Sequence, residues 1–174
     1  MSRRRAPDFA EALVGLRLWY FGQGEPELRS LGDRPPWPAG RAAVAVCYHL
    51  PSRMNQGEYR DFQPHPAPQR RCGCGIYALK AQEAVCELRR SYAHRWSAAA
   101  ALATFVSGEV SLWGKLIEHE GGYRAEYAYP RRILVPRSYR GFVHADDRRT
   151  IRRVDADEAA ALIAERYGIE AEVG

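Results

Sequence analysis

The sequence contains no apolar run long enough to cross a membrane. Its longest weakly polar stretch, residues 96–106, is rich in alanine and has about half the length that a membrane helix needs. Residues 3–5 are arginines, but the apolar segment of a secretion signal does not follow them, because Pro7, Asp8 and Glu11 interrupt it. These absences predict a cytoplasmic protein without a membrane partner.

Lysine is also scarce. Lys80 and Lys115 are the only two, so almost all of the 26 basic side chains are arginines, set against 21 acidic ones for a net charge of +5. A mild excess of this kind affects solubility and non-specific association rather than fold. Repeats and low-complexity tracts are absent, and 174 residues suit one domain. We expect residues 1–14 to be an extension or short helix and residues 15–174 to form a single α+β domain.

Hydrophobic patterning predicts an antiparallel sheet, or a half-open small barrel, packed against a central helical region and a C-terminal helix. Strands are expected over residues 16–21, 27–31, 42–49, 109–120, 123–129, 133–136 and 169–173. Helices are expected over residues 8–14, 78–92 and 155–167. Asp155 is the expected N-cap of the last helix and Gly168 its stop. The long hairpin is expected to turn at Gly121-Gly122, and Pro130 to end its second strand.

Cysteine is sparse too, yet three of the four cysteines gather with a histidine around one irregular region. Residues 50–71 carry prolines at positions 51, 64, 66 and 68, which exclude a long regular element, and so long a loop needs to be held in place. Three thiolates and an imidazole are a common closed ligand set for structural zinc. The candidate ligands are Cys47, His65, Cys72 and Cys74, with His49 as an alternative to His65. The spacing predicts a zinc-clamped loop.

Two other interpretations of these cysteines stay open. They are unliganded buried thiols, or Cys72 or Cys74 is a nucleophile. In the second case Cys74 would precede the N-terminus of a helix, which favours a thiolate, and His65 or His49 would be its base. No third, orienting group is evident, and C-x-C differs from the C-x-x-C of thioredoxin-like sites. The sequence therefore favours a binding protein over an enzyme. Cys86, in the middle of a predicted helix, is expected in the core.

The predicted hairpin carries a second group of polar and aromatic side chains. Glu118 and His119 are adjacent, so in a strand they point to opposite faces and do not easily serve one acid–base site. Cross-strand pairs of Glu118 with Arg124 and of Glu126 with Lys115 explain the same charges. Aromatic residues around the hairpin predict a ligand-binding surface. Its expected members are Tyr77, Trp113, Tyr123, Arg124 and Tyr127.

Arginines crowd residues 131–153, where Tyr139 and Phe142 stand among them. Such a segment could follow a phosphate backbone while its rings stack on bases, although Asp146 and Asp147 dilute the charge. Nucleic-acid binding is therefore an alternative function.

Four motifs together resemble those of a group of small uncharacterised actinobacterial proteins. They are Trp37-Pro-Ala-Gly40, His65-Pro-Ala-Pro68, Cys72-Gly-Cys-Gly-Ile-Tyr-Ala78, and Leu112-Trp-Gly114 continuing through Gly122-Tyr-Arg-Ala-Glu-Tyr-Ala-Tyr-Pro130. The resemblance covers residues 15–170 and implies the ligand order Cys, His, Cys-x-Cys, but no reaction. Motifs and composition together predict a zinc-stabilised binding or adaptor module for a protein or small ligand.

Overall fold

The structure is a computed structural model that describes residues 12–31, 35–47, 65–95, 104–144 and 150–174. Its elements in chain order are β1 (Leu13–Tyr20), β2 (Gln23–Gly24), β3 (Arg29–Ser30), β4 (Ala43–Val44), β5 (Ile76–Leu79), α1 (Gln82–Arg95), β6 (Phe105–His119), β7 (Gly122–Val135), β8 (Gly141–His144), β9 (Ile151–Val154), α3 (Ala156–Tyr167) and β10 (Glu170–Val173). The α+β class is confirmed. Most of the expected helix at 8–14 lies outside the described residues, and Leu13 and Val14 begin β1 instead.

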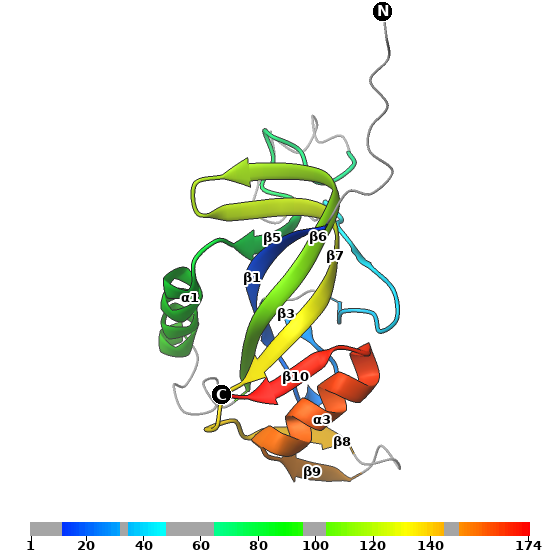
Figure 1. The fold of residues 1–174 in the computed structure, drawn as a ribbon, viewed down its shortest axis with the longest axis vertical. Coiled ribbons are helices and arrows are strands. Elements are labelled where there is room, and N and C mark those ends of the chain that lie inside the picture. Colours follow the sequence, from blue (N-terminus) through cyan, green and yellow to red (C-terminus); the bar gives the residue numbers. More distant parts are fainter. Residues whose placement is uncertain (1–11, 32–34, 48–64, 96–103, 145–149) are drawn as a thin grey trace, which may run out of the picture.

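One seven-stranded sheet is built around the long hairpin of β6 and β7 (Figure 1). β1 and β3 extend it beyond β6, while β5, β4 and β10 pair in succession with the other edge of β7. β10 runs parallel to β7, so the sheet is mixed rather than wholly antiparallel. β5 also meets β1, but only through the pair Leu16 and Leu79. A single bridge does not close a ring of strands firmly, so this sheet is not a true barrel.

The hairpin was predicted correctly except at its turn and at its end. His119 pairs with Gly122, so the two-residue turn is Glu120-Gly121, one residue earlier than expected. Pro130 does not end the strand, because β7 continues to Val135. The missing N–H of Pro130 is tolerated because the register between β6 and β7 shifts at this point.

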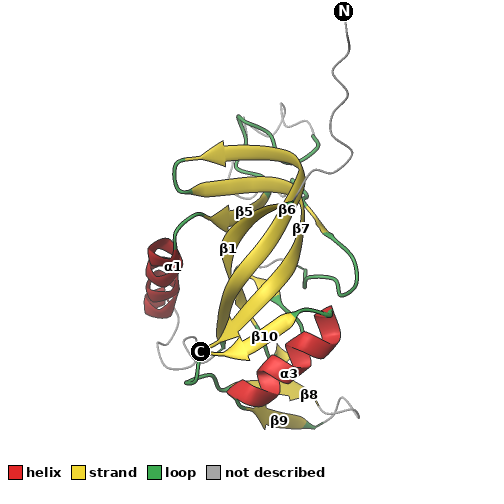
Figure 2. Cartoon of the chain, in the orientation of Figure 1, coloured by secondary structure: helices red, strands yellow, loops and turns green. Residues whose placement is uncertain are grey.

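The two helices of the described chain pack on opposite faces of the sheet (Figure 2). β1 separates the two cores by its alternation: Leu18 and Tyr20 pack with Val85 of α1, whereas Trp19 belongs to the larger core that includes α3. The start of α1 was predicted too early, because Ala78 lies in the alternating strand β5. α3 has the expected ends. The Asp155 carboxylate accepts a hydrogen bond from the Glu158 N–H at 3.0 Å, and Gly168 adopts the left-handed conformation.

A second sheet of three strands, in the order β2-β8-β9, packs beside the main one. The sequence pattern predicts no strand in this polar segment, of which residues 145–149 lie outside the description. Tyr139 explains the packing: its buried hydroxyl donates to the carbonyl oxygen of Phe21 at 3.0 Å. The side chain therefore lies against the backbone of Gly22 and Gly141 and joins the small sheet to the residue that follows β1.

Trp37 fixes the proline-rich segment 35–40. Its ring is buried and meets Trp19 edge-on, with centroids 5.5 Å apart. Its carbonyl accepts a hydrogen bond from the Tyr167 hydroxyl of α3 at 3.1 Å, and that hydroxyl accepts in turn from the N–H of Leu28 at 2.8 Å. Among the described residues, no helix is both long and apolar enough to span a membrane.

Candidate metal centre

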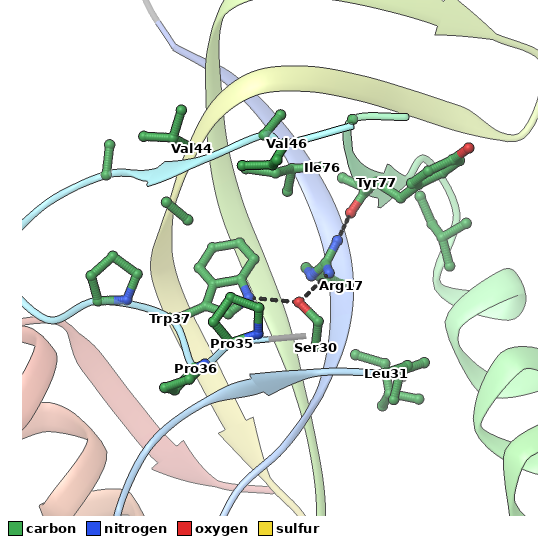
Figure 3. Close-up of a pocket in the computed structure, with 18 of the residues that line it drawn as sticks. Arg17, Ser30, Leu31, Pro35, Pro36, Trp37, Val44, Val46, Ile76 and Tyr77 are labelled. Atoms are coloured by element: carbon green, nitrogen blue, oxygen red, sulfur yellow. Dashed lines mark hydrogen bonds between the residues drawn. The ribbon is translucent and has the colours of Figure 1, made fainter. Parts of the chain in front are cut away.

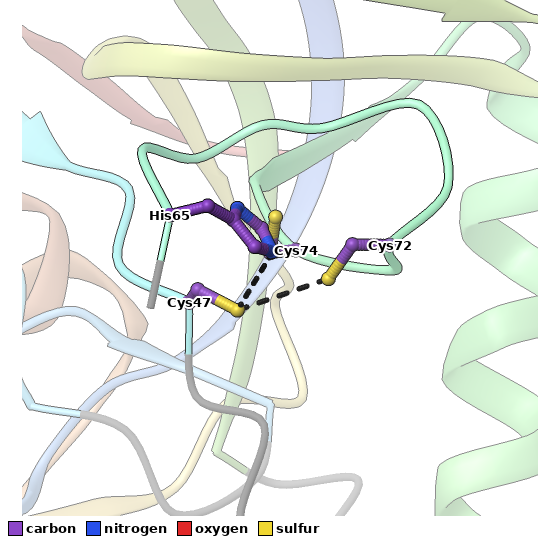
Figure 4. A group of neighbouring side chains, drawn as sticks. All are labelled: Cys47, His65, Cys72 and Cys74. Carbon is purple, nitrogen blue, oxygen red and sulfur yellow. Dashed lines mark hydrogen bonds between the residues drawn. The ribbon is translucent and has the colours of Figure 1, made fainter. Parts of the chain in front are cut away.

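The four predicted ligands converge at one end of the sheet (Figure 4). Cys47 follows β4, His65 begins the segment that resumes after residues 48–64, and Cys72 and Cys74 stand in the loop before β5. One donor atom from each lies within 4.8 Å of the other three. The expected set is therefore brought together. His49, the alternative ligand, lies outside the described residues.

Two of the six separations between the donor atoms equal those around a tetrahedral ion. With Zn–S bonds of about 2.3 Å and Zn–N bonds of about 2.0–2.1 Å, a tetrahedral centre places two sulfurs about 3.8 Å apart and a sulfur and a nitrogen about 3.6 Å apart. Cys47 Sγ lies 3.7 Å from Cys72 Sγ and 3.5 Å from His65 Nε2. The first distance is far longer than a disulfide bond and matches the spacing of two sulfurs around one ion.

The imidazole of His65 is oriented by its second nitrogen. Nδ1 lies 3.1 Å from the carbonyl oxygen of Pro66, which can only accept, so Nδ1 carries the proton of this bond. Nε2 then has a free lone pair, and this is the atom that faces Cys47. An outer hydrogen bond from Nδ1–H to a carbonyl is the usual way in which proteins fix a histidine that binds a metal through Nε2.

The loop that carries Cys72 and Cys74 is tied to the sheet by two side chains. Nη1 of Arg124, on β7, donates to the carbonyls of Gln69, Cys72 and Cys74, and the Arg124 side chain is buried. The hydroxyl of Tyr77, on β5, donates to the carbonyl of Gly73 at 2.5 Å. The C-x-C turn is therefore held in one shape by bonds that do not depend on a bound ion.

The protonation state of Cys72 favours a role as a metal ligand over a role as a nucleophile. Burial is the main cause that raises the pKa of this thiol to about 11, and its contacts with the neighbouring thiols add to the effect. A buried thiol of this kind stays protonated at neutral pH until a metal displaces the proton. The helix expected just after Cys74 begins only at Gln82, because β5 stands between Cys74 and α1. The dipole that would have activated a Cys74 thiolate is therefore missing.

Cys86 is not in the core as expected. It is exposed on α1, although the preceding residue, Val85, is buried. The predicted cross-strand ion pairs of the hairpin also differ from those observed. Glu118 pairs with Lys80 at 2.7 Å instead of with Arg124. The Glu126 carboxylate accepts from the backbone N–H of Lys115 at 2.9 Å, a donor exposed by the bulge in β6.

The structure places the five residues of the expected binding surface along the hairpin and β5, and it brings two of them together: the guanidinium of Arg124 lies 5.9 Å from the centre of the Tyr77 ring. Trp113 and Tyr127 stack on each other with centroids 6.2 Å apart on the outer part of the hairpin. Tyr123 lies against the ammonium of Lys80, and Arg124 is turned inward to the metal-binding loop. Tyr77 is exposed beside that loop.

Three of the six arginines that the structure describes within residues 131–153 are engaged with acidic side chains. Arg131 pairs with Glu109 and Arg132 with Glu172, and Arg152 contacts Glu158. Arg148 and Arg149 lie outside the described residues. The paired guanidinium groups form a mixed surface, which is less attractive to a phosphate backbone than a row of unpaired cations.

A cavity of about 690 Å³, which the sequence pattern does not predict, lies beside the candidate metal centre (Figure 3). We name it the β4–α1 cavity, because residues of β4 and α1 contribute to opposite walls, together with β1, β3 and β5. Residues 43–46 lead from it to Cys47, and residues 75–79 enter it from Cys74. One feature of the sequence could have indicated this cavity. Arg17 is the single charged residue in the otherwise apolar strand β1, and its side chain lines the cavity.

No protein-family model, curated protein or solved structure matches the chain.

Proposed function

We propose that this protein is a zinc-stabilised binding module without catalytic activity. Cys47, His65, Cys72 and Cys74 hold one zinc ion, and the ion ties the two ends of residues 48–64 to β5. When bound, the ion supplies a structural cross-link, as in other sites whose four positions are all filled by protein. The ligand binds beside this centre, where Tyr77 and the β4–α1 cavity adjoin the metal-binding loop.

The separation of the donor atoms carries this proposal, because 3.7 Å and 3.5 Å are the distances expected around a tetrahedral zinc ion. The donor set supports zinc in particular, since thiolates exclude magnesium and calcium and a full set of four leaves no position for a substrate. The ligand set also requires reduced thiols, which supports a cytoplasmic location.

Metal analysis of the purified protein tests the proposal. We expect about one equivalent of zinc in the wild type, and cobalt substitution should give the absorption of a tetrahedral thiolate site. Cys47→Ser should lose most of the metal. Cys86→Ser is the matched control, because it removes an exposed cysteine outside the cluster and should keep the full equivalent. Less than about half an equivalent in the wild type would refute the zinc centre.

Nucleic-acid binding is the second candidate, and one observation favours it: the guanidinium of Arg153 lies 5.8 Å from the ring of the exposed Phe142. Heparin chromatography tests it. Retention that disappears in a protein with Arg131, Arg132, Arg148 and Arg149 all changed to Ala would support it, whereas unchanged retention would exclude these arginines.

A further inference from the structure

The β4–α1 cavity has the size and lining of a small-molecule site. Its volume of about 690 Å³ lies within the range of about 300–1,000 Å³ that ligand pockets occupy. Leucine, valine, alanine and proline side chains make up most of the wall. Val44, Val46 and Tyr77 belong to this lining and are exposed, Val44 by 58%. Apolar surface therefore continues from the interior to the mouth.

The polar groups inside the cavity bond to one another. Ser30 Oγ accepts from the Trp37 indole N–H and from Nη2 of Arg17, both at 2.9 Å, and Arg17 also donates to the Tyr77 carbonyl (Figure 3). The guanidinium lies 5.0 Å from the centre of the Trp37 ring. Walls arranged in this way offer few partners to a polar heterocycle, whose buried donors and acceptors would go unpaired. A hydrocarbon body meets no such cost.

The charge of the lining has one sign. Among the described residues that line the cavity, the charged ones are Arg17 and Arg41, and no aspartate or glutamate accompanies them. Arg41 is exposed, which places it at the mouth, and it forms no ion pair with the part of the chain that the structure describes. A ligand with an apolar body would therefore gain from a negative head group beside Arg41.

From these contacts we propose that the β4–α1 cavity binds a free single-chain carboxylate, with the hydrocarbon chain inside the cavity and the carboxylate at Arg41. This proposal rests on the proposed binding function but not on the zinc. The aliphatic walls take the chain, and burial of its methylene groups drives the association. The exposed guanidinium sets the direction of entry and selects the sign of the head group.

Calorimetry on the zinc-loaded full chain tests the proposal with three probes of equal chain length: decanoate, decanol and decyltrimethylammonium. We expect saturable binding of decanoate at one site, weaker binding of decanol and still weaker binding of the cation. Vesicles containing phosphatidylglycerol should not carry the protein down on centrifugation. Vesicle binding without decanoate binding would overturn the proposal in favour of a membrane surface.

Two pairs of variants locate the site. Arg41→Met should weaken decanoate binding about fivefold and leave decanol unchanged, while Arg137→Met, an exposed arginine outside the lining, should change neither. Leu88→Trp places a larger ring in the wall and should weaken decanoate binding at least about tenfold. Leu162→Trp is the matched control, a half-buried leucine of α3 outside the lining.

The proposal is overturned if decanoate does not saturate, if it binds no better than decyltrimethylammonium, or if Leu88→Trp binds it as the wild type does. Each variant is checked for folding by circular dichroism and for its zinc content. Zinc at one equivalent without decanoate binding refutes the ligand and leaves the metal centre standing. Decanoate binding without zinc refutes the metal centre and leaves the ligand standing.

Discussion

The carbonyl oxygen of Cys74 accepts a hydrogen bond from Nη1 of Arg124 at 3.1 Å. The same nitrogen reaches the carbonyls of Cys72 and Gln69, so one buried cation from β7 orders the loop that supplies two of the four ligands. Three thiolates and a neutral imidazole around a divalent ion leave one negative charge. Arg124 would offset this charge in the metal-bound protein, and its hydrogen bonds set the geometry of the turn.

Replacement of Arg124 by Met is expected to weaken zinc binding about tenfold or more, because partners outside the ligand set typically change metal affinity by 10- to 100-fold. Arg124→Lys keeps the charge but loses the planar donor group, so it should restore only part of the affinity. Competition with a chelating dye measures both. Arg131→Met, an exposed arginine of the same strand, is the control. Equal affinities of Arg124→Met and Arg131→Met would show that the loop does not need this contact.

Alkylation of the metal-free protein should modify Cys86 well before Cys72. Cys86 is exposed on α1, whereas burial holds the pKa of Cys72 near 11, so its reactive thiolate is rare at neutral pH. Mass spectrometry of peptides after brief treatment with iodoacetamide gives the order. Faster labelling of Cys72 than of Cys86 would support a role of Cys72 as a nucleophile.

Zinc affinity should fall as the pH is lowered, because zinc must displace the proton of Cys72.

The metal cluster could be predicted from the sequence because the cysteines and the histidine bracket a proline-rich segment that needs a cross-link. The cavity could not, because its walls come from five elements distant in the chain, and their apolar residues look like ordinary core. The role of Arg124 was hidden for a similar reason. In a strand that alternates regularly, an arginine is expected at the surface, and only the loop that folds over β7 turns it into a buried donor.

The long hairpin and α3 were predictable because each carries local signals: alternation with glycines at the turn, and a capping aspartate with a glycine stop. The misplaced start of α1 has a local cause as well. Residues 76–79 read equally well as one turn of a helix or as a buried strand, and pairing with β7 decides between them.

Alkaline pH should destabilise the protein through its buried tyrosines. Burial is the main cause that raises the pKa of both Tyr139 and Tyr167. The folded state then holds phenolic protons that the unfolded state releases above about pH 10, so the free energy of unfolding falls as the pH rises beyond that point. Tyr139→Phe should lose about 1 kcal/mol at neutral pH with its hydrogen bond to Phe21.

The same variant should also show a shallower alkaline decline, because one of the buried phenols whose pKa is raised is gone. Urea unfolding at a series of pH values measures both effects, with Tyr123→Phe, a half-buried tyrosine of β7, as the control. If Tyr139→Phe and the wild type lose stability in parallel above about pH 10, burial of this hydroxyl is not the cause.

Removal of the N-cap of α3 should destabilise the fold without touching the metal. Asp155→Ala leaves the N–H of Glu158 without its acceptor, at a cost of about 1 kcal/mol in the free energy of unfolding. Asp157→Ala is the matched control, since it removes an exposed carboxylate from the same helical turn and should cost less. Thermal unfolding of the zinc-loaded proteins compares the two, and zinc content should stay constant. A loss of zinc in Asp155→Ala would mean that α3 and the metal centre unfold as one unit.

The two glycines of the C-G-C-G segment should respond differently to replacement by alanine. At Gly75 the backbone φ is +127°, and an added Cβ would lie 3.0 Å from the Cβ atoms of both Arg124 and Pro68. At Gly73 the nearest atom, the Tyr77 hydroxyl, would lie 3.6 Å away. Gly75→Ala should therefore destabilise the protein by about 1–3 kcal/mol, because a side chain at this left-handed position is strained.

Gly73→Ala should bind zinc nearly as the wild type does, since its side chain has room and the ligands on either side keep their positions. Urea unfolding with and without a chelator separates the two effects in each variant. If Gly75→Ala loses stability only while zinc is bound, the strain acts through the metal geometry. If it loses the same stability with the metal removed, the contacts with Arg124 and Pro68 order this loop before the ion arrives. The hydrogen bonds of Arg124 to the carbonyls of Cys72 and Cys74 favour the second outcome.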